Sequence, residues 1–178
     1  MQWKPFQFRG KTFDLAHLHP HSVTYEQPAK GAAPARVYRV DVIFGLHCFT
    51  RVRGQNVPHE SALLYGDDRE TRVFDFVRYE LSKQLPEIIK GLARRKCYHT
   101  GKGNFFSIEI TRRDREVLEY DIFFVASRSS MKGKINLFVQ SAYLRDENYA
   151  SNRPERKPIG FFVILFNTLN NKTIRAPK

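Results

Sequence analysis

The sequence predicts an α+β fold, in which an antiparallel β-sheet of roughly five to seven strands packs on one helical segment. Fifteen Phe and eight Tyr among 178 residues favour a sheet. Several segments that alternate apolar and polar residues flank a single stretch with helical spacing. The chain is long enough to bury one core, so we predict a single domain over residues 1–178. Residues 1–34 are expected to form an N-terminal hairpin or arm, and residues 72–178 the helix-plus-sheet core.

The first part of the chain contains one strong strand. Residues 35–50 alternate regularly, and every second residue from Tyr38 to Phe44 lies on one apolar face. Before this strand, the pattern over residues 6–15 predicts a short hairpin, and residues 28–34 predict a flexible loop with two prolines and a glycine.

The spacing becomes helical from about Arg72. Apolar residues recur every three or four positions between Phe74 and Leu92, with charged residues mostly on the other side. Pro86 interrupts this pattern, because its ring cannot sit in a helix interior without a kink. We therefore expect one helix to end near Gln84 and a short second helix to begin at Pro86.

The C-terminal region is predicted to form a meander of strands. Residues 105–110 form one strand, and residues 120–125 and 135–143 form a hairpin across a turn at 127–133. Residues 159–166 are a continuous apolar run, which is typical of a strand at the centre of a sheet.

The charge balance indicates a polyanionic partner. Thirty Lys and Arg against eighteen Asp and Glu give a net charge of +12, and clustered cations gain affinity for nucleic acid by releasing its counterions. Some clusters are interleaved with aromatic residues, which suits single-stranded RNA, so RNA is favoured over DNA. The alternative is a basic protein with no such partner. The residues predicted to contact nucleic acid are Arg94, Arg95, Lys96, Lys102, Arg128, Lys132 and Lys134.

The compartment follows from the absence of targeting signals. The N-terminal residues lack the apolar segment of a signal peptide, and the longest apolar run is too short to cross a bilayer. We predict a cytoplasmic protein with no membrane partner. Cys48 and Cys97 are far apart in sequence and can pair only if the fold brings them together.

The strand that ends near residue 145 carries the strongest candidate for chemistry. Ser141, Tyr143 and Arg145 occupy alternate positions, so on a strand they project from one face. A row of hydroxyl, phenol and guanidinium suits a phosphate-handling site, although a solvated strand end has the same pattern. His47, at the end of the strong early strand, is a candidate general acid or base. The neighbouring Cys48 is a weaker candidate nucleophile, and a core position is its alternative.

A second arrangement of histidines offers a metal-binding alternative. If the chain is extended there, His17, His19 and His21 project to one side, and His47, Cys48, Cys97 or His99 would be the additional ligands. The spacing matches no zinc motif, and the nucleotide-binding and metalloprotease motifs are absent. We therefore predict no metal and no cofactor.

From about Phe74 onward, the chain resembles the superfamily of small ribonucleases that includes barnase, EndoU, colicins and RelE, with members in phages and mobile elements. The resemblance rests on helices followed by a meander, and on the Gln140–Tyr143 strand end before a final apolar segment. It implies metal-independent RNA cleavage by basic, hydroxyl and sometimes histidine side chains. It places Ser141, Tyr143 and Arg145 at the scissile phosphate and Arg78 where it neutralises developing charge.

The sequence therefore leaves two main functions open. The first is a basic nucleic-acid-binding protein that acts as a metal-independent endoribonuclease of toxin or phage type, with a protein inhibitor or antitoxin as a further partner. The second is a non-catalytic regulatory or anti-defence protein that binds a nucleic acid or a protein. The two are distinguished by whether Arg78, Ser141, Tyr143 and Arg145 converge on one cleft.

Overall fold

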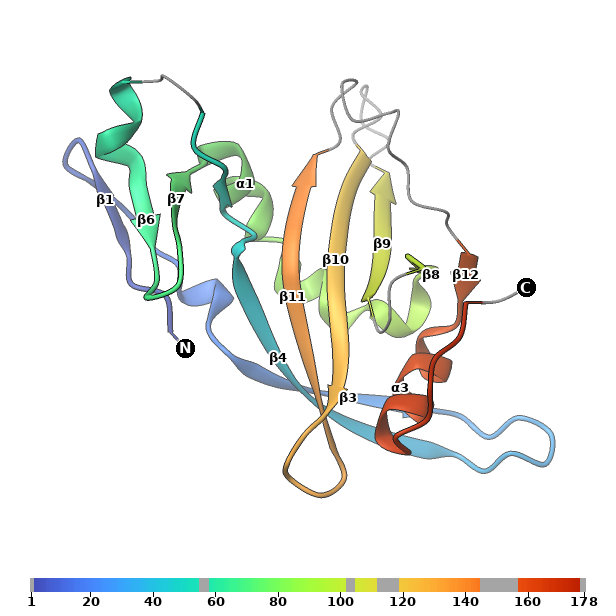
Figure 1. The fold of residues 1–178 in the computed structure, drawn as a ribbon. Helices are drawn as coiled ribbons and strands as arrows, with labels where there is room; N and C mark the ends of the chain where they lie inside the picture. Colours follow the sequence, from blue (N-terminus) through green and yellow to red (C-terminus); the bar gives the residue numbers. More distant parts are fainter. Residues whose placement is uncertain (1, 55–57, 102–104, 112–118, 145–156, 177–178) are drawn as a thin grey trace.

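A seven-stranded sheet is the main layer of the molecule (Figure 1). The computed structural model describes residues 2–54, 58–101, 105–111, 119–144 and 157–176. In spatial order the sheet contains β12 (Lys157–Ile159), β8 (Cys97–His99), β9 (Phe105–Thr111), β10 (Glu119–Arg128), β11 (Lys134–Leu144), β4 (Arg36–His47) and β3 (His21–Gln27). The predicted α+β class is correct.

The sheet is mixed, whereas the sequence analysis predicted an antiparallel sheet. β4 and β11 pair in parallel, with Ile135 opposite Val40, while the other neighbouring strands of this sheet pair antiparallel. The chain between β4 and β11 passes through helices and three further strands of the same sheet. Such a long connection allows a strand to return in the same direction, which a tight hairpin does not.

Two smaller sheets lie beside the end of β4 (Figure 1). β1 (Phe6–Phe8) and β2 (Lys11–Phe13) form the expected hairpin, and its turn residues Arg9 and Gly10 both have positive φ, as a two-residue hairpin turn requires. β5 (Thr50–Arg51), β7 (Thr71–Phe74) and β6 (Leu64–Gly66) form a three-stranded sheet in that order. Phe6 stacks on Phe74 with ring centroids 4.1 Å apart, which joins the hairpin to this sheet.

The predicted break in the helical segment is present. α1 (Phe76–Ser82) ends before Lys83, and α2 (Leu85–Lys90) begins with Pro86 in its first turn. The Asp75 carboxylate accepts a hydrogen bond of 2.9 Å from the Arg78 amide and caps α1. Short 3-10 helices occur at Ala16–Leu18, Pro58–Leu63 and Leu92–Arg94.

The prediction of a strand over residues 159–166 is wrong. Only β12 precedes Gly160, and the apolar run then forms α3 (Phe161–Leu169), so two helical segments pack on the sheet where one was expected. Buried residues on α3 follow helical spacing: Phe161, Ile164, Leu165 and Thr168. A short run of apolar residues fits either a buried strand or a helix, and here the helical packing against β10 and β11 decides between them.

The N-terminal residues contribute to the same core as the sheet. Trp3, Leu15, Leu18 and Tyr25 are all buried in it. The Tyr25 hydroxyl donates to the Ile89 carbonyl at 2.6 Å, and burial raises its pKa. This hydrogen bond links β3 to α2 across the core.

Two further observations bear on the sequence predictions. Cys48 and Cys97 are both free and both buried. Within the described residues, no helix is long and apolar enough to span a membrane.

The helical assignment of α3 can be tested with two truncations. Leu165 is fully buried and Val163 is half exposed, whereas a strand would place both side chains on one face. We expect Leu165→Ala to lower the free energy of unfolding by about 2–5 kcal/mol and Val163→Ala to change it by less than about 1 kcal/mol. Urea titration of the two variants measures this difference, and equal losses would contradict the helix.

Candidate functional site

The site begins where β4 ends. The parallel register between β11 and β4 shifts after Val139, and beyond the shift Ser141 lies opposite His47. A bulge of this kind redirects side chains near the end of a strand. The chain then turns tightly, with the Cys48 amide donating to the Gly45 carbonyl at 3.1 Å, and enters β5 at Thr50.

Arg78 connects this turn to α1. Its Nη1 donates to the Thr50 carbonyl at 2.7 Å and to the His47 carbonyl at 3.3 Å. Its guanidinium carbon lies 5.2 Å from the ring centroid of Tyr143, within the range of a cation–π contact. Burial lowers the pKa of Arg78, and nearby Asp75 opposes this effect. An arginine keeps its charge in such surroundings, so α1 presents a fixed cation to the end of β11.

His47 is held by a carboxylate from the loop before β7. Its Nε2 lies 2.5 Å from Glu70 Oε1, while Glu70 Oε2 lies 3.5 Å from Arg72 Nη1. The Arg72 Nε donates to the Thr50 hydroxyl at 3.0 Å, and that buried hydroxyl donates to the Leu46 carbonyl. A histidine with a carboxylate on one ring nitrogen has its other nitrogen oriented for proton transfer.

These groups surround one cavity of about 570 Å³, which we call the arginine cavity. It is lined by His47, Arg72, Asp75, Val77, Arg78, Leu81, Ser141, Tyr143 and Leu144. Four of the five predicted catalytic residues therefore converge: His47, Arg78, Ser141 and Tyr143. The fifth, Arg145, lies outside the described residues.

The arginine cavity has an excess of positive charge. Arg72 and Arg78 line it, and Arg51 lies 3.7 Å from Asp75 at its edge. Arg51 pairs with Asp75 and Arg72 with Glu70, so these three guanidinium groups outnumber the two carboxylates beside them. With the hydroxyls of Ser141 and Tyr143, this arrangement suits an anion such as a phosphodiester.

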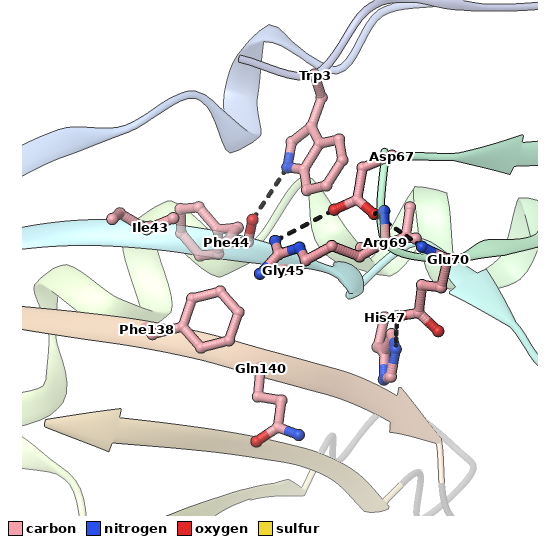
Figure 2. Close-up of a pocket in the computed structure, with 11 residues that line it drawn as sticks. Trp3, Ile43, Phe44, Gly45, His47, Asp67, Arg69, Glu70, Phe138 and Gln140 are labelled. Carbon is pink, nitrogen blue, oxygen red and sulfur yellow. Dashed lines mark hydrogen bonds and ion pairs between the residues drawn. The ribbon is translucent and has the colours of Figure 1, made fainter. Parts of the chain in front are cut away.

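A second cavity, whose lining residues Figure 2 shows, shares His47 with the first. We call it the Phe138 cavity; its volume is about 390 Å³. It is lined by Trp3, Ile43, Phe44, Gly45, Leu46, His47, Asp67, Arg69, Glu70, Phe138 and Gln140. The two cavities share His47, and Glu70 lines the second while it contacts Arg72 in the first.

The described residues among those predicted to bind nucleic acid line neither cavity. Arg128, Lys132 and Lys134 lie at the turn between β10 and β11, at the opposite end of β11 from Tyr143 (Figure 1). Lys134 forms an ion pair of 3.2 Å with Asp41.

The basic cluster before β8 is separate from that turn. Arg94, Arg95 and Lys96 are exposed, and β9 and β10 lie between β8 and β11. Lys102 lies outside the described residues. The six predicted contacts that the structure describes are therefore distributed over the surface and do not form one patch around the arginine cavity.

The histidine trio does not form a metal site. His17 Nε2 lies 2.8 Å from the Ser82 hydroxyl, His19 Nε2 lies 3.1 Å from the Trp3 carbonyl, and His21 Nδ1 lies 3.2 Å from the His19 carbonyl. Among the described residues, no three His, Cys, Asp or Glu side chains gather in a way that could hold a metal ion.

The cysteine beside His47 does not line either cavity. Cys48 is fully buried, and its thiol donates to the Val139 carbonyl at 3.4 Å. Burial raises the pKa of Cys48 to about 12, which disfavours the thiolate that a nucleophile requires. The core position proposed as the alternative is the one that Cys48 occupies.

Two members of the site, Glu70 and Arg72, were not predicted from the sequence. Both lie in a stretch where charges are frequent and no apolar periodicity marks a strand. Glu70 and Arg72 are two residues apart, so both side chains lie on one face of an extended segment. That was the available signal, but nothing in the sequence indicated that β7 lies next to the end of β4.

The family of the protein follows from comparison with known proteins. Residues 5–169 match the model of the YjaZ family. Protein YjaZ of Escherichia coli (strain K12) is 32% identical over 99% of this chain and 96% of its own length. The chain therefore belongs to the YjaZ family. No solved structure matches it. The family match does not test the resemblance to small ribonucleases, which stays a prediction.

The contact between His17 and Ser82 predicts a pH effect on stability. The Ser82 hydroxyl donates to the Tyr79 carbonyl at 2.7 Å, so it accepts from His17 Nε2. Burial is the main cause that lowers the pKa of His17 in the fold. Protonation of His17 therefore favours the unfolded chain. The stability that the neutral imidazole contributes is fully present above the pKa of His17 in the unfolded chain, about 6.5, and is lost as the pH falls below that value.

We expect the wild-type protein to lose stability between about pH 7 and pH 5, and His17→Gln to lose less over the same range. Chemical denaturation at each pH measures the difference. His21→Gln, in the same segment, controls for the loss of an imidazole. Parallel stability–pH curves for the wild type and His17→Gln would count against this role.

Proposed function

We propose that this protein binds RNA through the arginine cavity and cleaves it as a metal-independent endoribonuclease in the cytoplasm. One observation supports this proposal above the others. A histidine with a carboxylate partner, two arginines, a serine and a tyrosine from four separate parts of the chain line a single cavity. General acid–base chemistry on a phosphodiester requires such groups together.

In the proposed reaction, the ribose 2′-oxygen attacks the adjacent phosphorus. His47 accepts the 2′-hydroxyl proton at Nδ1, because Glu70 occupies its Nε2. The new bond joins the 2′-oxygen to phosphorus as the bond to the 5′-oxygen breaks. The Tyr143 phenol supplies the proton to the leaving 5′-oxygen. The products are a 2′,3′-cyclic phosphate and a 5′-hydroxyl.

The remaining groups stabilise the negative charge on the non-bridging oxygens of the transition state. Arg78 and Arg72 lie on the cavity wall, and each is already oriented by protein acceptors. Preoriented charges cost little reorganisation when the transition state forms. The Ser141 hydroxyl donates to a non-bridging oxygen. Glu70 acts through His47, as a positioning residue that stabilises the imidazolium.

A second candidate function is a non-catalytic protein that binds a nucleic acid or a protein partner. The observation that favours it is that the carboxylates Glu70 and Asp75 offset much of the arginine charge. Such pairing leaves less positive charge to stabilise a transition state at phosphorus, which suits binding without cleavage. The two candidates differ in whether RNA is cut.

Incubation of the purified protein with total RNA tests the proposal. We expect cleavage with and without chelator, leaving 2′,3′-cyclic phosphate ends. His47→Asn should slow cleavage about 10²- to 10⁴-fold through loss of the base. Tyr143→Phe should slow it about 100-fold, because it removes the phenolic proton but keeps a ring beside Arg78. Rates are measured on a fluorescent oligonucleotide.

Arg39→Ala is the surface control, because Arg39 is exposed on β4 far from His47 and lines neither cavity. We expect it to cleave RNA like the wild type. Thermal unfolding of each variant shows whether it is folded. Intact RNA with every protein would overturn the nuclease and leave the binding function. Cleavage that the chelator abolishes would instead contradict the metal-independent mechanism.

A further inference from the structure

We propose that the Phe138 cavity is a nucleobase site that selects a purine on the 5′ side of the phosphate held in the arginine cavity. The inference rests on the proposed function for the position of that phosphate. The base site itself depends only on the lining of the Phe138 cavity, and nucleotide binding tests it without RNA cleavage.

The position of the cavity fits one nucleotide across both sites. The two cavities meet at His47, with Glu70 behind it. Gln140 lines the Phe138 cavity and the next residue, Ser141, lines the arginine cavity. A base is flat and uncharged and its own 3′-phosphate is negatively charged. One nucleotide therefore requires a stacking site next to a positively charged site.

The walls of the Phe138 cavity suit a flat, uncharged ring. Trp3, Ile43 and Leu46 contribute apolar surface. Phe138 is 36% exposed, a large apolar side chain open to solvent in the middle of a sheet face. Bases of single-stranded RNA stack on exposed aromatic rings of this kind. A cavity of about 390 Å³ is within the size range of small-molecule sites.

Gly45 determines how close the Phe138 ring lies to β4. A Cβ at position 45 would be 2.9 Å from Phe138 Cζ and 2.9 Å from the Gln140 carbonyl oxygen. Any other residue would therefore displace the ring or the strand. Glycine at this position allows the aromatic ring to lie directly against the backbone of β4 and form the floor of the cavity.

The polar groups of the cavity favour a purine. Gln140 lines the cavity, and Figure 2 shows its side chain extending from β11. Its amide has no hydrogen-bond partner among the described residues. Glutamine pairs with N6 and N7 of adenine, and arginine pairs with O6 and N7 of guanine. Gln140 and Arg69 thus present the two side chains that recognise the N7 edge, which pyrimidines lack.

The loop that carries Arg69 is held in one conformation. The Asp67 carboxylate accepts hydrogen bonds from the amides of Arg69 at 2.9 Å and Glu70 at 3.1 Å, and these bonds lower its pKa. Asp67 Oδ2 also accepts from Arg69 Nη2 at 3.2 Å (Figure 2). One turn therefore positions Arg69 in the base site and Glu70 on His47.

Binding of 3′-nucleotides tests the inference directly. By calorimetry we expect adenosine or guanosine 3′-monophosphate to bind the wild type at least about five-fold more tightly than the uridine or cytidine compounds. Phe138→Ala should weaken purine binding about 5- to 100-fold through lost stacking. Gln140→Ala should reduce the preference between purine and pyrimidine. Inorganic phosphate measures the contribution of the arginine cavity alone.

Two substitutions serve as matched controls. Asn136→Ala removes a side-chain amide four residues before Gln140 on the same strand, and Asn136 lines neither cavity. Phe166→Ala removes a partly buried phenylalanine on α3. Both should keep the purine preference of the wild type.

The outcomes separate this inference from the proposed function. Equal binding of all four nucleotides, or a purine preference unchanged in Phe138→Ala and Gln140→Ala, would overturn the base site and leave the nuclease standing. Purine-selective binding lost in those two variants, with RNA left intact, would support the base site and overturn the nuclease. No binding of any nucleotide or of phosphate would overturn both.

Discussion

The parallel pairing of β4 with β11 is the constraint on which the arrangement of the site depends. It places the carboxyl ends of both strands together, so that His47 lies opposite Ser141. In an antiparallel pairing, the end of β4 would lie beside Lys134. The eleven residues of β11 span about 33 Å, which would separate His47 from Tyr143 by most of that length. The direction of one strand therefore decides that imidazole, hydroxyl and phenol share a cavity.

Arg78 then fixes the end of β4 to α1. A buried guanidinium is costly unless acceptors surround it, and here the carbonyls of His47 and Thr50 are those acceptors. The same contacts prevent the side chain from moving away from Tyr143. Arg78 is therefore both a structural link between two elements and an immobile charge beside the end of β11.

Part of this site could be predicted from the sequence because it depends on local spacing. Residues 141 and 143 share a face on any strand, and His47 stands at the end of the clearest strand in the chain. Glu70 and Arg72 could not be placed, because their position depends on the pairing of β7 with β5, and long-range pairing has no local signal. For the same reason Phe138 and Gln140 were seen only as members of a strand.

The errors in the predicted fold have the same origin. Periodicity determines the faces of an element, but it does not determine the direction in which two distant strands pair. The α3 segment was assigned to a strand because eight consecutive apolar residues satisfy both periods. Its packing against β10 and β11, not its composition, makes it a helix.

The division of the site into two cavities is a further consequence of the bulge on β11. Gln140 is the extra residue of β11 in its pairing with β10. Phe138 and Gln140 line the Phe138 cavity, and Ser141 and Tyr143, which follow, line the positively charged arginine cavity. A ribonucleotide has the same division, with a flat base at one end and a phosphate at the other. Its 2′-hydroxyl lies between them. In this protein the group between the two cavities is the imidazole of His47, a kind of side chain that can take a proton from such a hydroxyl.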